Sequence, residues 1–249
     1  MRSNTNRLIF INKQFSTIFN LKVMTMLKVN RAKVMGCIIL VTFFCLLSNA
    51  QYVKDIDGKV YKMVKIGQRI WAAENLCVVR FLNGDSIFEA KTPEEWEKAG
   101  LSKKPAWCFY DNNIANGKLY GILYNWYAVS DLRGLAPKGS HIPTNADWTA
   151  LTKSQGGVDI AGIKMKNTTG WNPKSKGTNR SGFTGLPGGI RNGAGIFSGI
   201  NDKGQWWSIS ETIGGTNQGY SVILSYSSVE VAYSSMDKVY GFSVRVVAD

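Results

Sequence analysis

The sequence predicts an α+β domain over residues 51–249, with short helices, a twisted and mostly antiparallel sheet, and a loop-rich C-terminal half. Three observations predict this class. A hairpin signal lies at 57–76, a capped helix begins at Thr144, and short strands separated by glycine, asparagine and serine follow from residue 182 onward. Because no internal repeat or low-complexity linker interrupts this region, we expect one domain.

The first elements are a hairpin and a core segment. In 57–76, apolar and polar residues alternate around Gly67-Gln68, the pattern of two antiparallel strands joined by a tight turn. Lys91–Gly100 carries an acidic run and is predicted to be a short exposed helix or a loop. Gly121–Val129 is solidly apolar and aromatic, which predicts core.

A helix is predicted next, over Thr144–Gln155. Thr144 is a good N-cap residue and Asp147 follows three positions later, as in a capping box. Trp148 and Leu151 have the spacing of one buried helix face. A second short helix is expected at Ile160–Lys166. Short strands are predicted in the rest of the chain, at Gly182–Ile190, Gly195–Ile200, Gln205–Ser210, Tyr220–Tyr226, Val229–Tyr233 and Gly241–Val247.

Residues 1–50 are predicted to be an N-terminal extension that ends in a secretory signal peptide. They hold seven basic residues and no acidic one, which leaves 23 basic against 17 acidic residues in 51–249. This modest surplus argues against nucleic acid as a partner. The apolar region 35–48 follows a basic approach and precedes the small residues Ser48 and Ala50, as at a cleavage site before Gln51. It is shorter than the about 20 residues that span a bilayer, so no stable membrane span is expected in the mature chain.

Two cysteines, Cys77 and Cys108, remain after this processing. Export permits a disulfide between them. The sequence does not show whether the two meet, and two buried free thiols are the alternative.

Seven blocks occur in order along nearly the whole mature chain: 57–76, 106–113, 120–129, 141–151, 181–192, 205–211 and 241–247. Their sequences, among them AWCFYDNN, YGILYNWYAV and SGFTGLPGGIRN, resemble the Fibrobacter succinogenes major paralogous domain of secreted and surface proteins in Bacteroidetes and Fibrobacteres. The resemblance implies a C-type-lectin-like fold, shared with formylglycine-generating enzymes and bacterial variable binding proteins. It implies a fold and a secreted or cell-surface location, but no established activity.

The chain departs from the pattern of that family at three positions. Ala136 and Val246 stand where its members typically carry cysteines, and Ser140 replaces a tryptophan. Both cysteines are replaced together, as expected for partners in a disulfide that the resemblance implies. The redox-active cysteine pair of formylglycine-generating enzymes is also absent, so their activity is not implied.

Catalysis is not expected. His141 is the only histidine, and it lies in a turn before a helix, where a fold-stabilising role is favoured. Glu74 and Glu211 lie in family-like blocks and are the best candidates for a hydrolase that uses paired carboxylates. For each of them, hydrogen bonding to the backbone of a loop is the favoured interpretation.

No cofactor and no metal are expected. One histidine and two distant cysteines do not make a closed zinc site. The calcium motifs of sugar-binding C-type lectins do not occur, although the oxygen-rich loop Asp111–Asn113 is left open as a place for a structural ion. The glycine-rich segment 185–189 lacks the Lys-Ser/Thr ending of a phosphate loop and is predicted to be a turn.

Two surface features are the candidate binding sites. The first is a stretch without acidic residues between 160 and 201, predicted to be either a patch for anionic glycans or a solvated loop. Its basic residues are Lys164, Lys166, Lys174, Lys176, Arg180 and Arg191.

The second feature is a tyrosine- and serine-rich stretch at 220–240, a composition typical of antibody paratopes. The resemblance implies a ligand face in this region, and we expect an exposed surface formed by Trp206, Tyr220, Tyr226 and Tyr233. Neighbours on a strand point to opposite faces, so Trp207 is assigned to the core with Trp148.

We therefore expect a secreted, non-catalytic binding module whose partner is an extracellular glycan or protein. One alternative is a structural or matrix surface protein that packs against copies of itself. The other is a hydrolase that uses Glu74 or Glu211.

The first testable prediction concerns export. Because the order of basic, apolar and small residues at 28–50 is that of a cleavable signal, we expect the exported protein to begin at Gln51. N-terminal sequencing of protein recovered outside the cytoplasm checks this, and an intact Met1 or Met35 would contradict it.

Overall fold

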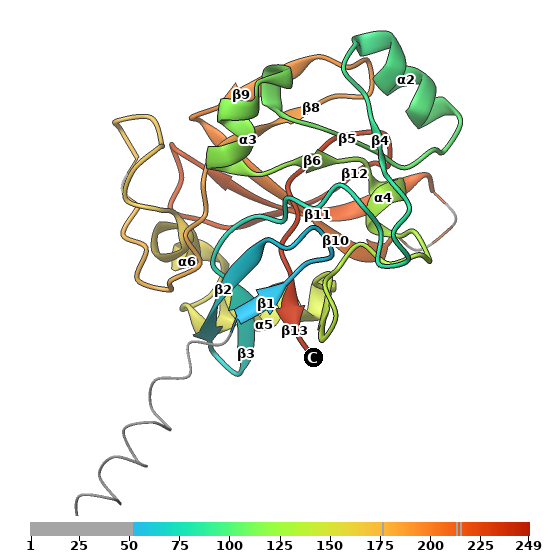
Figure 1. The fold of residues 1–249 in the computed structure, drawn as a ribbon. Coiled ribbons are helices and arrows are strands. Elements are labelled where there is room, and N and C mark those ends of the chain that lie inside the picture. The colour runs from blue at the N-terminus through green and yellow to red at the C-terminus, as the bar shows by residue number, and fades with distance from the viewer. Residues whose placement is uncertain (1–51, 176, 213, 215) are drawn as a thin grey trace, which may run out of the picture. The chain divides into compact units, whose positions relative to one another are not determined.

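The computed structural model describes residues 52–175, 177–212, 214 and 216–249. The predicted extension and signal peptide at 1–50 lie outside these residues. The described chain has a mixed α+β fold of curled, mainly antiparallel sheets with a few short helices (Figure 1). This confirms the predicted α+β class.

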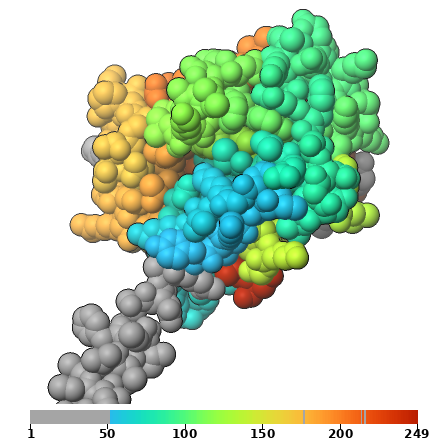
Figure 2. Space-filling model, viewed as in Figure 1, coloured from blue at the N-terminus to red at the C-terminus, as the bar shows by residue number. Residues whose placement is uncertain are grey.

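The predicted N-terminal hairpin is formed by β2 (Val60–Ile66) and β3 (Arg69–Ala72). Gly67 in its turn has a φ of +63°, a left-handed conformation that favours glycine. The hairpin lies on the molecular surface, as the blue atoms in Figure 2 show.

The hairpin also pairs with the C-terminal segment. Trp71 of β3 lies opposite Val247 of β13 (Val247–Ala248) in an antiparallel ladder. Figure 1 shows β13 in red beside the blue hairpin. The sheet has the order β1-β2-β3-β13-β7, in which the outer strands are β1 (Tyr52–Lys54) and β7 (Ser140–His141).

Two further sheets complete the described β structure. The larger has the order β12-β11-β10-β8-β9, with β8 (Gly188–Arg191), β9 (Phe197–Ile200), β10 (Lys203–Glu211), β11 (Gln218–Ser225) and β12 (Ala232–Asp237). Its pairs are antiparallel except for β8 with β10. The smaller has the order β4-β5-β6, with β4 (Phe88–Glu89), β5 (Ala106–Cys108) and β6 (Leu123–Tyr124).

Four of the described helices, α2, α3, α4 and α5, begin at residues whose side chains cap them. Thr144 caps α5, and Thr144 and Asp147 form the predicted capping box. Thr92 and Glu95 form a second capping box, which makes the 91–100 segment a helix rather than a loop. The helices of the described chain are α2 (Pro93–Leu101), the 3-10 turn η1 (Tyr110–Asn112), α3 (Ile114–Tyr120), α4 (Trp126–Val129), α5 (Asn145–Ser154) and α6 (Val158–Met165).

Three predicted strands are shorter than expected, among them the one at Gly195–Ile200, which begins only at Phe197. The strand at Gly182–Ile190 begins only at Gly188. The strand at Gly241–Val247 is mostly irregular, because this segment changes partners as it crosses the molecule. Ser243 bonds to the backbone of β10, whereas Val246 accepts a hydrogen bond from Ala72 of β3. Every residue from 241 to 248 is nevertheless buried.

A buried amide, that of Asn75, connects these layers. Its Oδ1 accepts hydrogen bonds from Trp206 Nε1 at 2.8 Å and from Arg245 Nε at 2.7 Å. Its Nδ2 donates to the carbonyl of Tyr120 at 2.7 Å and to Ser243 Oγ at 3.2 Å. All four hydrogen-bonding capacities of the side chain are therefore used in the interior.

We predict that Asn75→Ala lowers the free energy of unfolding by about 2–5 kcal/mol, because the buried donors of Trp206 and Arg245 each lose an acceptor. Urea denaturation of the full chain measures this loss. The control is Asn83→Ala at an exposed turn, which should change stability by less than about 0.5 kcal/mol. Equal stability of the two variants would contradict the central role of Asn75.

Candidate functional site

Trp206 lies in the core, and its predicted exposure as a ligand contact is wrong. Its side chain is 0% exposed and packs with Trp148 and Phe183. Trp207 is also buried, on the opposite face of β10, where its ring stacks with Phe242. The exposure of Trp206 would require one face of this strand to meet solvent. Instead, β10 is covered on both faces, so that each tryptophan enters a different core cluster.

The three tyrosines of the predicted surface occupy different environments. Tyr220 is half-buried on β11. Tyr233 is 38% exposed, but its hydroxyl lies 2.8 Å from Thr152 Oγ1 on α5. Burial raises the pKa of Tyr233 above its ordinary value. Tyr226, in the turn after β11, lines a hollow that opens to solvent.

The predicted cationic patch is divided between surface and interior. Lys166 is 1% exposed, and its Nζ donates to the carbonyls of Ser225 and Ser228 at 2.8 and 2.6 Å. Burial lowers the pKa of Lys166. Its assignment to an exposed patch is therefore wrong, and the side chain holds the turn that carries Tyr226.

The other basic residues of the stretch also have separate positions. Lys164 is half-buried and donates to the carbonyl of Gln155 at 2.7 Å. Arg191 is fully buried and donates to backbone carbonyls. Lys174 and Arg180 are exposed, and Lys176 lies outside the described residues.

The two predicted surface features meet in one hollow of about 370 Å³, here called the Tyr226 hollow. Its lining comes from the tyrosine- and serine-rich stretch and from the basic stretch: Lys166, Lys174, Tyr226, Ser227, Ser228 and Val229. The backbone of Asp202 accepts a hydrogen bond from the Tyr226 amide at 2.9 Å, and its carboxylate accepts one from Asn172 Nδ2 at 3.2 Å. Asp202 thus connects the turn that carries Tyr226 to the basic stretch that carries Lys174.

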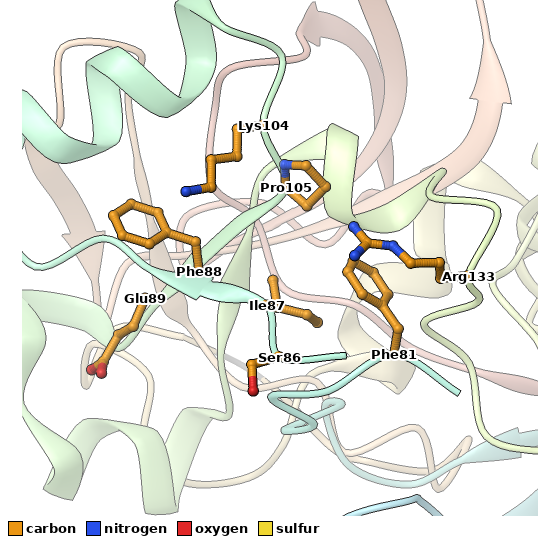
Figure 3. A pocket seen from close by; sticks show the side chains of 8 residues that line it. All are labelled: Phe81, Ser86, Ile87, Phe88, Glu89, Lys104, Pro105 and Arg133. Atoms are coloured by element: carbon orange, nitrogen blue, oxygen red, sulfur yellow. The ribbon is translucent and has the colours of Figure 1, made fainter. Parts of the chain in front are cut away.

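A second hollow, of about 450 Å³, lies where the segment before β4 meets the loop after α4. We call it the Arg133 hollow, and it is lined by Phe81, Ser86, Ile87, Phe88, Glu89, Lys104, Pro105 and Arg133 (Figure 3). None of these eight residues is predicted as a site residue from the sequence. They come from three separate segments and share no motif.

The two candidate hydrolase carboxylates form separate ion pairs. Glu74 forms an ion pair with Lys59 Nζ at 3.0 Å, and Glu211 forms one with Lys238 Nζ at 3.1 Å. Neither lines the Tyr226 hollow or the Arg133 hollow. Each carboxylate therefore has a lysine as its charged partner in the structure.

His141 links the C-terminal segment to the start of α5, which fits the expected fold-stabilising role. Its Nδ1 lies 2.8 Å from Asp249 Oδ1, and its Nε2 lies 3.3 Å from Asp147 Oδ2. Both ring nitrogens thus face carboxylate oxygens. Thr144 Oγ1 donates to Asp147 at 2.7 Å, so the nearby hydroxyl serves the helix cap.

The disulfide that export would permit is not formed. Cys77 and Cys108 are free thiols that pack in different core clusters. Burial raises the pKa of Cys77 and raises that of Cys108 to about 12.

The described residues contain no group of three or more histidine, cysteine, aspartate or glutamate side chains placed to hold a metal ion. In the loop considered for a structural ion, the Asn113 side chain caps α3 and Asn112 donates to the carbonyl of Lys91. No helix in the same part of the chain has the length and apolar character to cross a bilayer.

The chain matches a known protein family. A family model described as the Fibrobacter succinogenes major domain matches residues 64–248. No curated protein and no solved structure matches the chain.

The contacts of Asp147 predict an acid-dependent stability. Burial would raise the pKa of its carboxyl, but hydrogen bonds from Thr144 and His141 outweigh this and lower it. A carboxyl with a depressed folded pKa stabilises the fold above the unfolded pKa of about 3.9, and this contribution is lost as the pH falls through the folded value.

We predict that Asp147→Asn is less stable than the parent at neutral pH and that the difference shrinks below about pH 4. Urea denaturation at a series of pH values measures it, and a difference that is constant with pH would contradict the assignment.

Proposed function

The chain belongs to the Fibrobacter succinogenes major domain family, and we propose that it is a secreted, non-catalytic module that binds a saccharide in the Tyr226 hollow. The observation that carries the proposal is the meeting of two separate stretches, one rich in tyrosine and serine and one basic, around a single hollow of about 370 Å³. A hollow of this volume is within the range of small-ligand sites.

The lining suits a ligand rich in hydroxyl groups. The half-buried ring of Tyr226 offers an apolar face for a sugar ring, and its hydroxyl can bond to a sugar hydroxyl. Ser227 and Ser228 add hydroxyls that act as donors and as acceptors. Lys174 is exposed at the edge and adds a cation for an acidic sugar.

The turn that presents Tyr226 is held before any ligand arrives. Lys166 binds the carbonyls on both sides of it, at Ser225 and Ser228. The Tyr226 amide is bonded to Asp202. A preorganised loop loses less conformational entropy when it binds, and this supports recognition by this turn rather than by a mobile loop.

For the fold we propose the C-type-lectin-like class. Support comes from the pairing of β3 with β13, which brings the two ends of the described domain together, and from the long irregular segments between them. Export through the signal at 35–48 would bring such a module to extracellular glycans. The ion pairs of Glu74 and Glu211 favour binding over hydrolysis as its role.

A saccharide array probed with the exported protein tests this function, followed by calorimetry on the best ligand. We expect Tyr226→Ala to weaken binding at least about tenfold, because the ring contributes the largest apolar contact of the site. Lys174→Gln should weaken binding selectively for acidic sugars.

Arg180→Gln is the matched control, since Arg180 is exposed in the same basic stretch but does not line the hollow. It should bind like the parent. Undiminished binding by Tyr226→Ala, with an unchanged thermal midpoint, would place the ligand elsewhere. Binding of proteins but of no saccharide would also overturn the proposal.

A further inference from the structure

The Arg133 hollow has a fixed apolar floor. Phe81 and Ile87 are buried beneath it. The amide of Ile87 donates to the carbonyl of Val79, and the carbonyl of Ile87 accepts from Trp107 Nε1 at 3.0 Å. Hydrogen bonds at both the amide and the carbonyl of Ile87 therefore fix the floor, and no ligand is needed to order it.

One wall of the hollow is the flat guanidinium of Arg133. It stacks on Phe81, with 4.1 Å between its Cζ and the ring centroid. Both oxygens of Asp131 accept its hydrogen bonds at 2.9 Å, and Asp85 accepts a third at 3.0 Å. Its charge is thus neutralised and its plane is fixed. A planar guanidinium of this kind offers a surface on which an aromatic ring can stack.

The opposite end of the hollow carries Lys104, as Figure 3 shows. Its ammonium lies 4.1 Å from the centroid of the Phe88 ring, and no carboxylate of the described residues lies within ion-pair distance of it. The Glu89 carboxylate is paired with Lys91 at 3.4 Å and points away from Lys104 in Figure 3. Lys104 is therefore the lining cation whose charge is not balanced by a contact.

We propose that the Arg133 hollow is a second binding site, separate from the saccharide site, and that its ligand is a small aromatic carboxylate. The ring would lie on Ile87 and Pro105 against the fixed guanidinium plane. The carboxylate would bind the ammonium of Lys104. The volume of about 450 Å³ accommodates one such molecule.

Three probes test the contributions of the ring and of the carboxylate separately. The first is 3-phenylpropionate, which has both groups. The second, 3-cyclohexylpropionate, has the same charge but no planar ring, and the third, 3-phenylpropanamide, has the same ring but no charge. Calorimetry on the exported protein should show saturable binding of 3-phenylpropionate, at least about tenfold tighter than of either analogue. In a ¹H–¹⁵N spectrum, ring-current shifts should appear at the amides of Ile87 and Phe88.

The variant Lys104→Gln should weaken binding of 3-phenylpropionate about tenfold. The adjacent exposed residue supplies the control, because Lys103→Gln removes a charge one position away that does not line the hollow. Tyr226→Ala should also leave this binding unchanged, so failure at one site can be told from failure at the other. No saturable binding of 3-phenylpropionate at about 10 mM, or equal binding by Lys104→Gln and the parent, would overturn the proposal.

Discussion

The carboxamide of Asn75 is the contact on which the arrangement of layers depends. It joins the segment after the hairpin to the end of α3, to β10 and to the C-terminal segment, through Tyr120, Trp206, Ser243 and Arg245. An amide whose donors and acceptors are all used cannot shift toward one partner without leaving another unpaired in the interior. The backbone at Gly121, with a φ of +81°, passes so close that a Cβ there would lie 2.8 Å from that of Asn75. The layers are therefore positioned by a polar group, and apolar packing fills the space around it.

The buried cations follow the same principle. Arg245, Arg191 and Lys166 lie in the interior of the described chain, where carbonyl oxygens and aromatic faces hold them and no carboxylate forms an ion pair with them. Burial lowers the pKa of Arg245 to about 9. Backbone carbonyl oxygens accept hydrogen bonds from these cations and so compensate their buried charges. Each cation therefore fixes the loops whose carbonyls it binds. Part of the positive surplus of the sequence is thus internal structure, which explains why a count of basic residues overstated the exposed patch.

A structural feature could be predicted from the sequence where it depends on residues that are close together in the chain. Alternation around Gly67 predicted the β2–β3 hairpin, and the Thr144–Asp147 spacing predicted α5, because both patterns arise from neighbouring residues. The burial of Trp206 was not predictable in this way, since it depends on a second layer that is distant in sequence. For the candidate site, composition found Tyr226 and Lys174 but did not reveal that Lys166 is buried beneath the turn. No pattern of neighbouring residues predicts the Arg133 hollow, because its lining comes from three segments that are distant in the sequence.

The contact between Arg245 Nη1 and the carbonyl of Ala72 at 2.6 Å spans 173 residues of sequence. Contacts so distant along the chain are costly to form early, since the loop between them must close before they stabilise anything. We therefore infer that the seating of residues 241–248 against both sheets is a late step of folding. Until that step the hydrogen bonds of Arg245 to Ala72 and Phe183 and the pairing of Val247 with Trp71 cannot form. The same segment that closes the core thus sets the time at which the molecule becomes committed to its folded state.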